Sequence, residues 1–178
     1  MRKDSPAKRV ILDTNIYGRI LEEFHQKVIR EAVDRGVLKG HFIIYGFDVI
    51  RKELRATSRK TIIGNEKVRL TVLNFYDLLV GNHTLVIDQE MKDLAGKYYK
   101  VYKELGGSSK EHEILNDFII VAGSSMKNFD IIYSEDNKTM ASETAVKSYK
   151  IVNGLNNIRT PYFEDYTKFI KEIRRLLS

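Results

Sequence analysis

The chain has 178 residues, 43% of them hydrophobic, which fits a single globular domain with a substantial core. It contains no cysteine, so disulfides, thiolate metal sites and cysteine nucleophiles are excluded. The 30 basic and 24 acidic residues give a formal net charge of +6, an excess that attracts anionic partners but does not by itself define a nucleic-acid-binding protein. No apolar run is long enough to cross a bilayer, and residues 1–6 lack the apolar stretch of a secretory signal, so we expect a cytoplasmic protein without membrane contact.

The first third of the chain alternates strand and helix patterns. The expected elements are a strand over 9–13, a helix over 16–35, a strand over 42–45 and a short helix over 47–56. The first helix is expected to bury Ile20, Leu21, Phe24 and Val28, and Gly36 ends it.

The middle of the chain continues this alternation. Apolar residues from Val68 to Val80 recur at helical spacing, and a strand over 84–87 follows. Asp88 is a suitable N-cap for a helix that Gly106 and Gly107 end. A capping-box pattern over 108–111 then predicts a helix over 109–126.

The last third is expected to hold a strand over 130–133, a helix over 137–148 and a short edge strand over 150–152. Thr160 and Pro161 are typical of a helix start, as cap and first-turn proline. The C-terminal helix that would follow buries one stripe of side chains: Phe163, Tyr166, Ile170, Ile173 and Leu177.

Strands separated by helices of this length imply right-handed crossovers and a parallel sheet covered by helices on both faces. The fold class is therefore α/β, in three α/β/α layers. We expect one domain over residues 1–178, with 1–7 as a flexible N-terminal segment.

Two carboxylates follow the ends of predicted strands. Asp13 closes the buried pattern of Val10–Leu12, and Asp136 follows the strand over 130–133. The carboxyl ends of parallel strands share one edge, where open α/β sheets bind ligands. Each aspartate could instead simply cap the helix that follows it.

Two further acids lie within apolar helical stripes. Asp117 has Ile114 and Val121 at helical spacing, and Glu53 has Ile50 and Leu54 nearby. A buried carboxylate without a partner must bind a cation or take up a proton. The alternatives are an aspartate at the edge of the stripe that reaches solvent, and a surface ion pair of Glu53 within 51–55.

Together, Asp13, Glu53, Asp117 and Asp136 would repel one another unless a cation lies among them. The four histidines are scattered without metal-ligand spacing, which favours a hard cation held by oxygen over zinc. We therefore interpret the chain as a metal-dependent nuclease in which these acids are the catalytic and metal-binding residues. Supporting contacts to the metal ligands are expected from Thr14, Asn15 and Ser134, and contacts to nucleic acid from Arg51, Lys52, Arg55, Arg59 and Lys60.

The same residues resemble the PIN-domain family of nucleases, over most of the chain. Residues 10–15 look like its opening strand and first acid, 49–54 like its helical glutamate followed by leucine, and 117–122 like its third motif. Residues 130–136 resemble its fourth motif, a strand that ends in a hydroxyl residue, any residue and aspartate. The Thr160-Pro161 pair is also similar to the family's C-terminal end.

The resemblance implies a parallel sheet of about five strands, Mg²⁺ or Mn²⁺ held by the acids, and hydrolysis of RNA. Many small members are VapC-like toxins of toxin–antitoxin pairs, dimeric and blocked by an antitoxin peptide. Between Glu53 and Asp117 this chain is longer than the smallest toxins. The extra length argues against the toxin assignment but not against the fold assignment.

Three alternatives stay open at the level of sequence. The chain could be a PIN-fold nucleic-acid-binding or scaffold module without catalysis, although all four acids are present. It could be an RNA processing or decay nuclease unrelated to any antitoxin. A phosphatase of the haloacid dehalogenase type needs a second aspartate two residues after the first, where this chain has Asn15.

Overall fold

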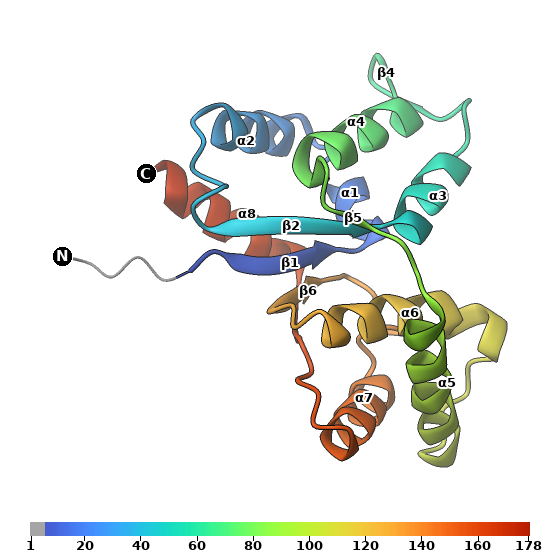
Figure 1. The fold of residues 1–178 in the computed structure, drawn as a ribbon. Coiled ribbons are helices and arrows are strands. Elements are labelled where there is room, and N and C mark those ends of the chain that lie inside the picture. The colour runs from blue at the N-terminus through green and yellow to red at the C-terminus, as the bar shows by residue number, and fades with distance from the viewer. Residues whose placement is uncertain (1–5) are drawn as a thin grey trace.

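The computed structural model describes residues 6–178 and is built on a five-stranded parallel sheet (Figure 1). The strand order is β5-β2-β1-β6-β7, which confirms the expected parallel sheet. The strands are β1 (Lys8–Leu12), β2 (Phe42–Phe47), β5 (Thr84–Leu85), β6 (Ile131–Tyr133) and β7 (Tyr162–Glu164). Strands β1 and β6 pair so that Val10 lies beside Ile131 and Leu12 beside Tyr133.

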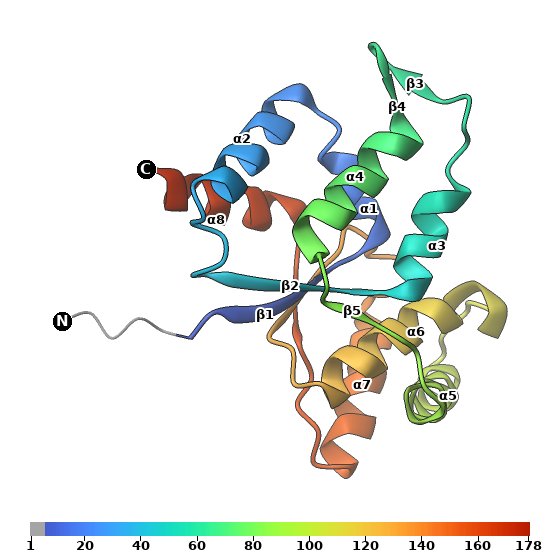
Figure 2. The ribbon, with the colours of Figure 1, turned by 45° about the horizontal axis from the view of Figure 1, so that its top comes forward.

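Helices cover both faces of the sheet and complete the three-layer α/β/α arrangement (Figures 1 and 2). One layer holds α1 (Thr14–Arg19), α2 (Glu23–Asp34), α3 (Asp48–Ala56), α4 (Val68–Val80) and α8 (Tyr166–Leu177). The other layer holds α5 (Gln89–Glu104), α6 (Glu111–Met126) and α7 (Glu143–Leu155). The fold is the PIN-like architecture that the resemblance implied.

The direction of winding reverses at the middle of the sheet. From β1 the chain passes to β2 and β5 on one side, and later to β6 and β7 on the other, so β1 and β6 are adjacent although 118 residues separate Asp13 from Ile131. In open α/β sheets the crevice beyond the carboxyl ends of two such strands is the usual ligand site. Asp13 and the segment Ser134–Asp136 lie at this crevice.

The central part of the sheet, Val10–Leu12 of β1 and the whole of β6, forms where the sequence is continuously apolar, as expected for strands buried on both faces. Val10, Ile11 and Leu12 are fully buried, and all three residues of β6 are buried. Gly46 on β2 allows the Tyr76 ring to approach closely, because a Cβ at this position would lie 2.1 Å from the Tyr76 hydroxyl oxygen. That hydroxyl donates to the carbonyl of Phe47 at 3.2 Å, which fixes α4 on the sheet.

The expected helix over 16–35 is wrong as a single element, because the chain breaks it between α1 and α2. As a result Phe24, expected to be buried, is 57% exposed, while Ile20 is fully buried. The expected capping box lies two residues later than 108–111: α6 begins at Glu111, and the N–H of Lys110 donates to the Glu113 carboxylate at 2.8 Å. Of the strand over 84–87, only Thr84 and Leu85 pair with β2.

The C-terminal third contains the largest errors of the sequence-based prediction. The edge strand over 150–152 is wrong, because these residues belong to α7. The helix over 137–148 is displaced, since 137–142 form turns and α7 begins at Glu143 behind the N-cap Ser142. The helix start at Thr160-Pro161 is wrong too: these residues precede β7, and Asp165 caps α8 by accepting from the N–H of Lys168.

A small antiparallel hairpin, β3 (Ile62–Ile63) and β4 (Glu66–Lys67), projects beyond α4 and was not predicted from the sequence (Figure 2). Within residues 6–178, no helix has both the length and the apolar composition needed to cross a membrane. The predicted flexible segment 1–7 falls mostly outside the described residues.

Candidate functional site

Asp13 ends β1 in a buried position, with 6% of its surface exposed. Its carboxylate accepts hydrogen bonds of 2.7 Å from the N–H of Thr14, the side-chain amide of Asn15 and the hydroxyl of Ser134. The pKa of Asp13 is raised above its ordinary value by burial and by the charges of Glu53 and Asp136, although the hydrogen bonds from Ser134 and Thr14 oppose the rise. Asp13 therefore caps α1 and also faces other carboxylates, so the capping alternative does not exclude a role in a site.

Ser134 links the ends of β1 and β6. Its hydroxyl donates to Asp13 and accepts the backbone N–H of Asp136 at 3.0 Å. Asn15 supports the same loop, since its side-chain oxygen accepts the N–H of Glu135 at 3.0 Å. The hydroxyl of Ser134 thus connects the carboxylate of Asp13 to the backbone N–H of Asp136, the two acids that the strand-end pattern predicted to share this edge.

Asp117 lies on the buried face of α6 and meets Asp136 through the hydroxyl of Thr139. This hydroxyl lies 2.6 Å from an oxygen of Asp117 and also contacts an oxygen of Asp136. Burial, followed by the charges of Asp13, Asp136 and Glu53, raises the pKa of Asp117 to about 7, against the lowering effect of Thr139.

Glu53 projects from α3 and is half-buried. The hydroxyl of Thr14 donates to it at 2.6 Å, and the side-chain amide of Asn116 lies 3.4 Å away. Because the N–H of Thr14 also donates to the carboxylate of Asp13, Thr14 connects Glu53 to the end of β1. The alternative reading of Glu53, an ion pair within 51–55, is wrong, because Glu53 forms no ion pair within residues 6–178.

Four carboxylates from four elements thus converge at the crevice between β1 and β6. Across residues 6–178, none of the four forms an ion pair with lysine, arginine or histidine. Their partners are instead neutral donors: Thr14, Asn15, Asn116, Ser134 and Thr139. Within the described residues, no positively charged side chain pairs with the carboxylates of the cluster.

The donor set fits a hard divalent ion in chemistry, because it consists of carboxylate and hydroxyl oxygens. In the part of the chain described, no three acidic or histidine side chains are already arranged to hold a metal ion.

The predicted nucleic-acid contacts divide into two groups. Arg51 makes a two-pronged ion pair with Asp77, at 3.1 and 3.0 Å, and Lys52 pairs with Asp48 at 3.2 Å. Arg55, Arg59 and Lys60 are exposed and have no ion pair within residues 6–178. Only the second group is free of a counter-charge.

Thr139 and Asn116 were missed from the sequence. Thr139 belongs to the turns after β6, where the Asp136 carboxylate accepts the N–H groups of Lys138 and Thr139 at 2.9 Å. The signal for Thr139 was available as a hydroxyl residue three positions after a strand-end aspartate, a spacing typical of capped turns. Asn116 carries no comparable signal.

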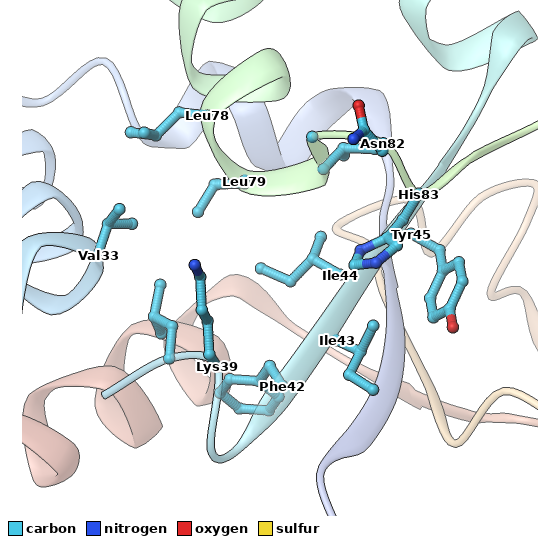
Figure 3. Close-up of a pocket in the computed structure, with 13 residues that line it drawn as sticks. Val33, Lys39, Phe42, Ile43, Ile44, Tyr45, Leu78, Leu79, Asn82 and His83 are labelled. Atoms are coloured by element: carbon cyan, nitrogen blue, oxygen red, sulfur yellow. The ribbon is translucent and has the colours of Figure 1, made fainter. Parts of the chain in front are cut away.

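A mainly apolar hollow lies elsewhere, beside β2 and the end of α4, with a volume of about 590 Å³ (Figure 3). It is lined mainly by apolar side chains such as Phe42, Ile44 and Leu79, with Lys39 and His83 at its edges. No carboxylate of the acidic cluster lines it. The acidic cluster, at the carboxyl ends of β1 and β6, is therefore separate from this hollow.

No protein-family model matches the chain, and no curated protein matches its sequence. Solved structures do match its fold. A structure of VapBC2 from Rickettsia felis bound to a DNA fragment from their promoter is 12% identical and covers 88% of this chain and 98% of its own, with a TM-score of 0.53.

Two further structures give the same result. VapBC-1 from nontypeable Haemophilus influenzae is 17% identical, covers 89% of this chain and 98% of its own, and has a TM-score of 0.55. FitAcB from Neisseria gonorrhoeae is 15% identical, covers 87% and 96%, and also has a TM-score of 0.55. At these identities the likeness is one of fold, and it extends over nearly the whole of each matched chain.

Proposed function

We propose that this chain is a divalent-metal-dependent endoribonuclease. The observation that carries the proposal is the convergence of Asp13, Glu53, Asp117 and Asp136 at one crevice without any basic counterpart. Uncompensated carboxylates in a partly buried crevice are costly, and a hard cation removes that cost. The likeness in fold to VapBC and FitAcB structures supports the same class of protein.

When bound, Mg²⁺ or Mn²⁺ would lower the pKa of a water molecule and neutralise charge on the phosphate under attack. Asp13, Asp117 and Asp136 would hold the ion directly or through water, and Glu53 would act as a further ligand or orient the attacking water. Asn15 and Ser134 hold the carboxylate of Asp13 in place through hydrogen bonds. Thr14 does the same for Glu53.

The test is cleavage of a labelled single-stranded RNA circle by the purified chain, with MnCl₂ or MgCl₂ and with EDTA. A circle opens only by internal cleavage, so products in the metal lanes alone are expected. A single-stranded DNA circle of matched sequence measures the preference for RNA. Intact RNA in every lane, together with RNA binding, would favour the scaffold alternative.

Binding of the metal is measured separately by thermal unfolding. An ion that binds only the folded chain at ten times its dissociation constant adds about 1.4 kcal/mol of stability. We expect the melting temperature to rise with millimolar Mn²⁺ in the wild type and not in Asp13→Asn. An unchanged melting temperature in both would contradict the metal site.

We propose further that the chain is the toxin of a toxin–antitoxin pair, acting as a homodimer with an antitoxin peptide as partner. The matched structures are of VapBC and FitAcB complexes, which supports this assignment. Induced expression in a bacterium should stop growth, and Asp117→Asn should abolish that effect. Normal growth with an active purified enzyme would favour RNA processing or decay instead.

A further inference from the structure

The segment between α3 and α4 is exposed and contains the cations Arg59, Lys60 and Lys67. It contains the β3–β4 hairpin, which projects from the helical layer (Figures 1 and 2). Ile62 and Ile63 on the hairpin are 58% and 54% exposed, and Leu70 in the first turn of α4 is 59% exposed. Exposed apolar side chains next to cations are typical of an interaction surface.

Three cations of this segment face one hollow of about 270 Å³ at the base of the hairpin. Arg59 comes from the loop after α3, Lys67 from β4 and Arg69 from α4, and Leu70 and Leu73 complete the lining. We name these five residues the basic hollow. Its lining contains no carboxylate.

The charges of the basic hollow are not balanced by the protein. Across residues 6–178, Arg59, Lys67 and Arg69 form no ion pair. The nearest acid in sequence, Glu66, instead accepts the hydroxyl of Thr71 at 2.9 Å.

Local helix stability does not explain these cations either. The first turn of α4 contains no acidic residue, and positive side chains at a helix N-terminus are unfavourable because of the helix dipole. Like charges that gather around a hollow without stabilising the fold indicate an anionic ligand.

We propose that the basic hollow binds a phosphate of unpaired RNA, with Leu70 and Leu73 against the adjoining base or ribose. The leucines favour an unpaired segment, because the bases of a duplex are covered by stacking and pairing. The position of the basic hollow also fits a ligand shared with the acidic cluster. Arg59 follows Glu53 by six residues, so their Cα atoms are at most about 22 Å apart. RNA bound at the acidic cluster therefore reaches the basic hollow within a few nucleotides, a step that rests on the proposed function.

The experiment measures binding without catalysis. Fluorescence anisotropy follows a labelled 12-nucleotide oligouridylate in EDTA, over a range of NaCl concentrations, so that failure of metal-dependent cleavage does not affect the result. The variant Arg59→Gln/Lys67→Gln/Arg69→Gln is expected to bind about 10- to 100-fold more weakly at low salt. Its slope of log affinity against log salt should fall by about 0.7, the value for one lost phosphate contact to a single strand.

The matched control removes three exposed lysines from α5, on the opposite helical layer: Lys92→Gln/Lys97→Gln/Lys100→Gln. It has the same net charge as the test variant and should bind within about twofold of the wild type, since its lysines lie away from the hollow. Equal losses in both variants would mean diffuse attraction and would overturn the proposal. Because none of the six side chains belongs to the buried core, far-ultraviolet circular dichroism should show both variants folded.

Two further measurements address the apolar half of the hollow and the class of ligand. Leu70→Ser should weaken oligouridylate binding about three- to tenfold without changing the salt slope, because the lost contact is apolar. Binding of a 12-base-pair RNA duplex should not respond to Leu70→Ser. A wild-type chain that ignores RNA but binds poly-L-glutamate through the same three cations would overturn the proposal in favour of an acidic polypeptide.

Discussion

The acidic cluster and the basic hollow are both sets of like charges without opposite partners, but they are built in opposite ways. The carboxylates sit on sheet ends and helices and are held by hydroxyl and amide donors such as Ser134 and Thr139. The cations of the basic hollow extend from a loop, a two-residue strand and a helix start.

The difference separates two demands that the proposed nuclease function makes. Chemistry at a phosphate requires ligands fixed to within a fraction of an ångström, which packed elements and hydrogen bonds provide. Holding a flexible single strand requires charge and apolar contact but little fixed geometry. The predictions below test whether each region has the property that its construction implies.

Removal of one acid should have the largest effect. Asp117→Asn is expected to reduce metal-dependent cleavage roughly a thousandfold, since several kcal/mol of transition-state stabilisation is lost with a metal ligand. Initial rates on the RNA circle give the ratio. The control is Glu111→Gln, an exposed acid on the same helix, which should cleave at the wild-type rate. Normal cleavage by Asp117→Asn would remove this residue from the site.

Thr139 tests whether the hydroxyl network orients the acids. Thr139→Val retains the shape but removes the group between Asp117 and Asp136, and should lower cleavage about 10- to 100-fold. The metal concentration for half-maximal rate should rise at the same time. Thr139→Ser keeps the hydroxyl and should restore both values; a serine variant as impaired as valine would indicate a packing role only.

The metal-free stability of the chain should reveal the electrostatic cost of the acidic cluster. The pKa of Asp117 is raised from 3.8 to about 7, so the folded chain binds a proton more tightly than the unfolded chain does. Stability is then lost as pH rises from about 4 to about 7, with the full penalty present above that range.

Urea unfolding in EDTA measures this penalty. At pH 8 we expect Asp117→Asn to be more stable than the wild type by on the order of 2 kcal/mol, which allows for partial exposure of the carboxyl. At pH 4 the difference should nearly vanish. A constant difference from pH 4 to pH 8 would show that another interaction is responsible.

The smallest effect is expected where a cation already has a partner. Arg51 is held by Asp77, so Arg51→Gln should change oligouridylate affinity by less than about twofold, whereas Arg59→Gln alone should reduce it more. Anisotropy titrations of the two single variants at one salt concentration make the comparison. If Arg51→Gln proved the weaker binder, the ion pair with Asp77 would have to open for RNA, and the distinction between paired and unpaired cations would not hold.

Local sequence was most informative where one strong pattern decided the outcome. Continuous apolar runs predicted β1 and β6, and Asp88 caps α5 as expected, accepting the N–H of Met91 at 2.9 Å. The errors come from competing local signals. Thr160-Pro161 fits a helix start, but pairing with β6 holds the following residues extended, and Asp165 supplies the cap instead. Residues 150–152 fit a strand or a helix equally well, and packing of α7 on α5 selects the helix.

The sequence by itself determined the α/β class and the four acids, because strand ends and apolar helical stripes fix which residues share an edge or a face. Only the tertiary structure decided how those acids connect and which cations remain unpaired. Thr139 contacts Asp117 across 22 residues, and Asp77 pairs with Arg51 across 26. Such contacts depend on the docking of separate elements, for which no local pattern exists.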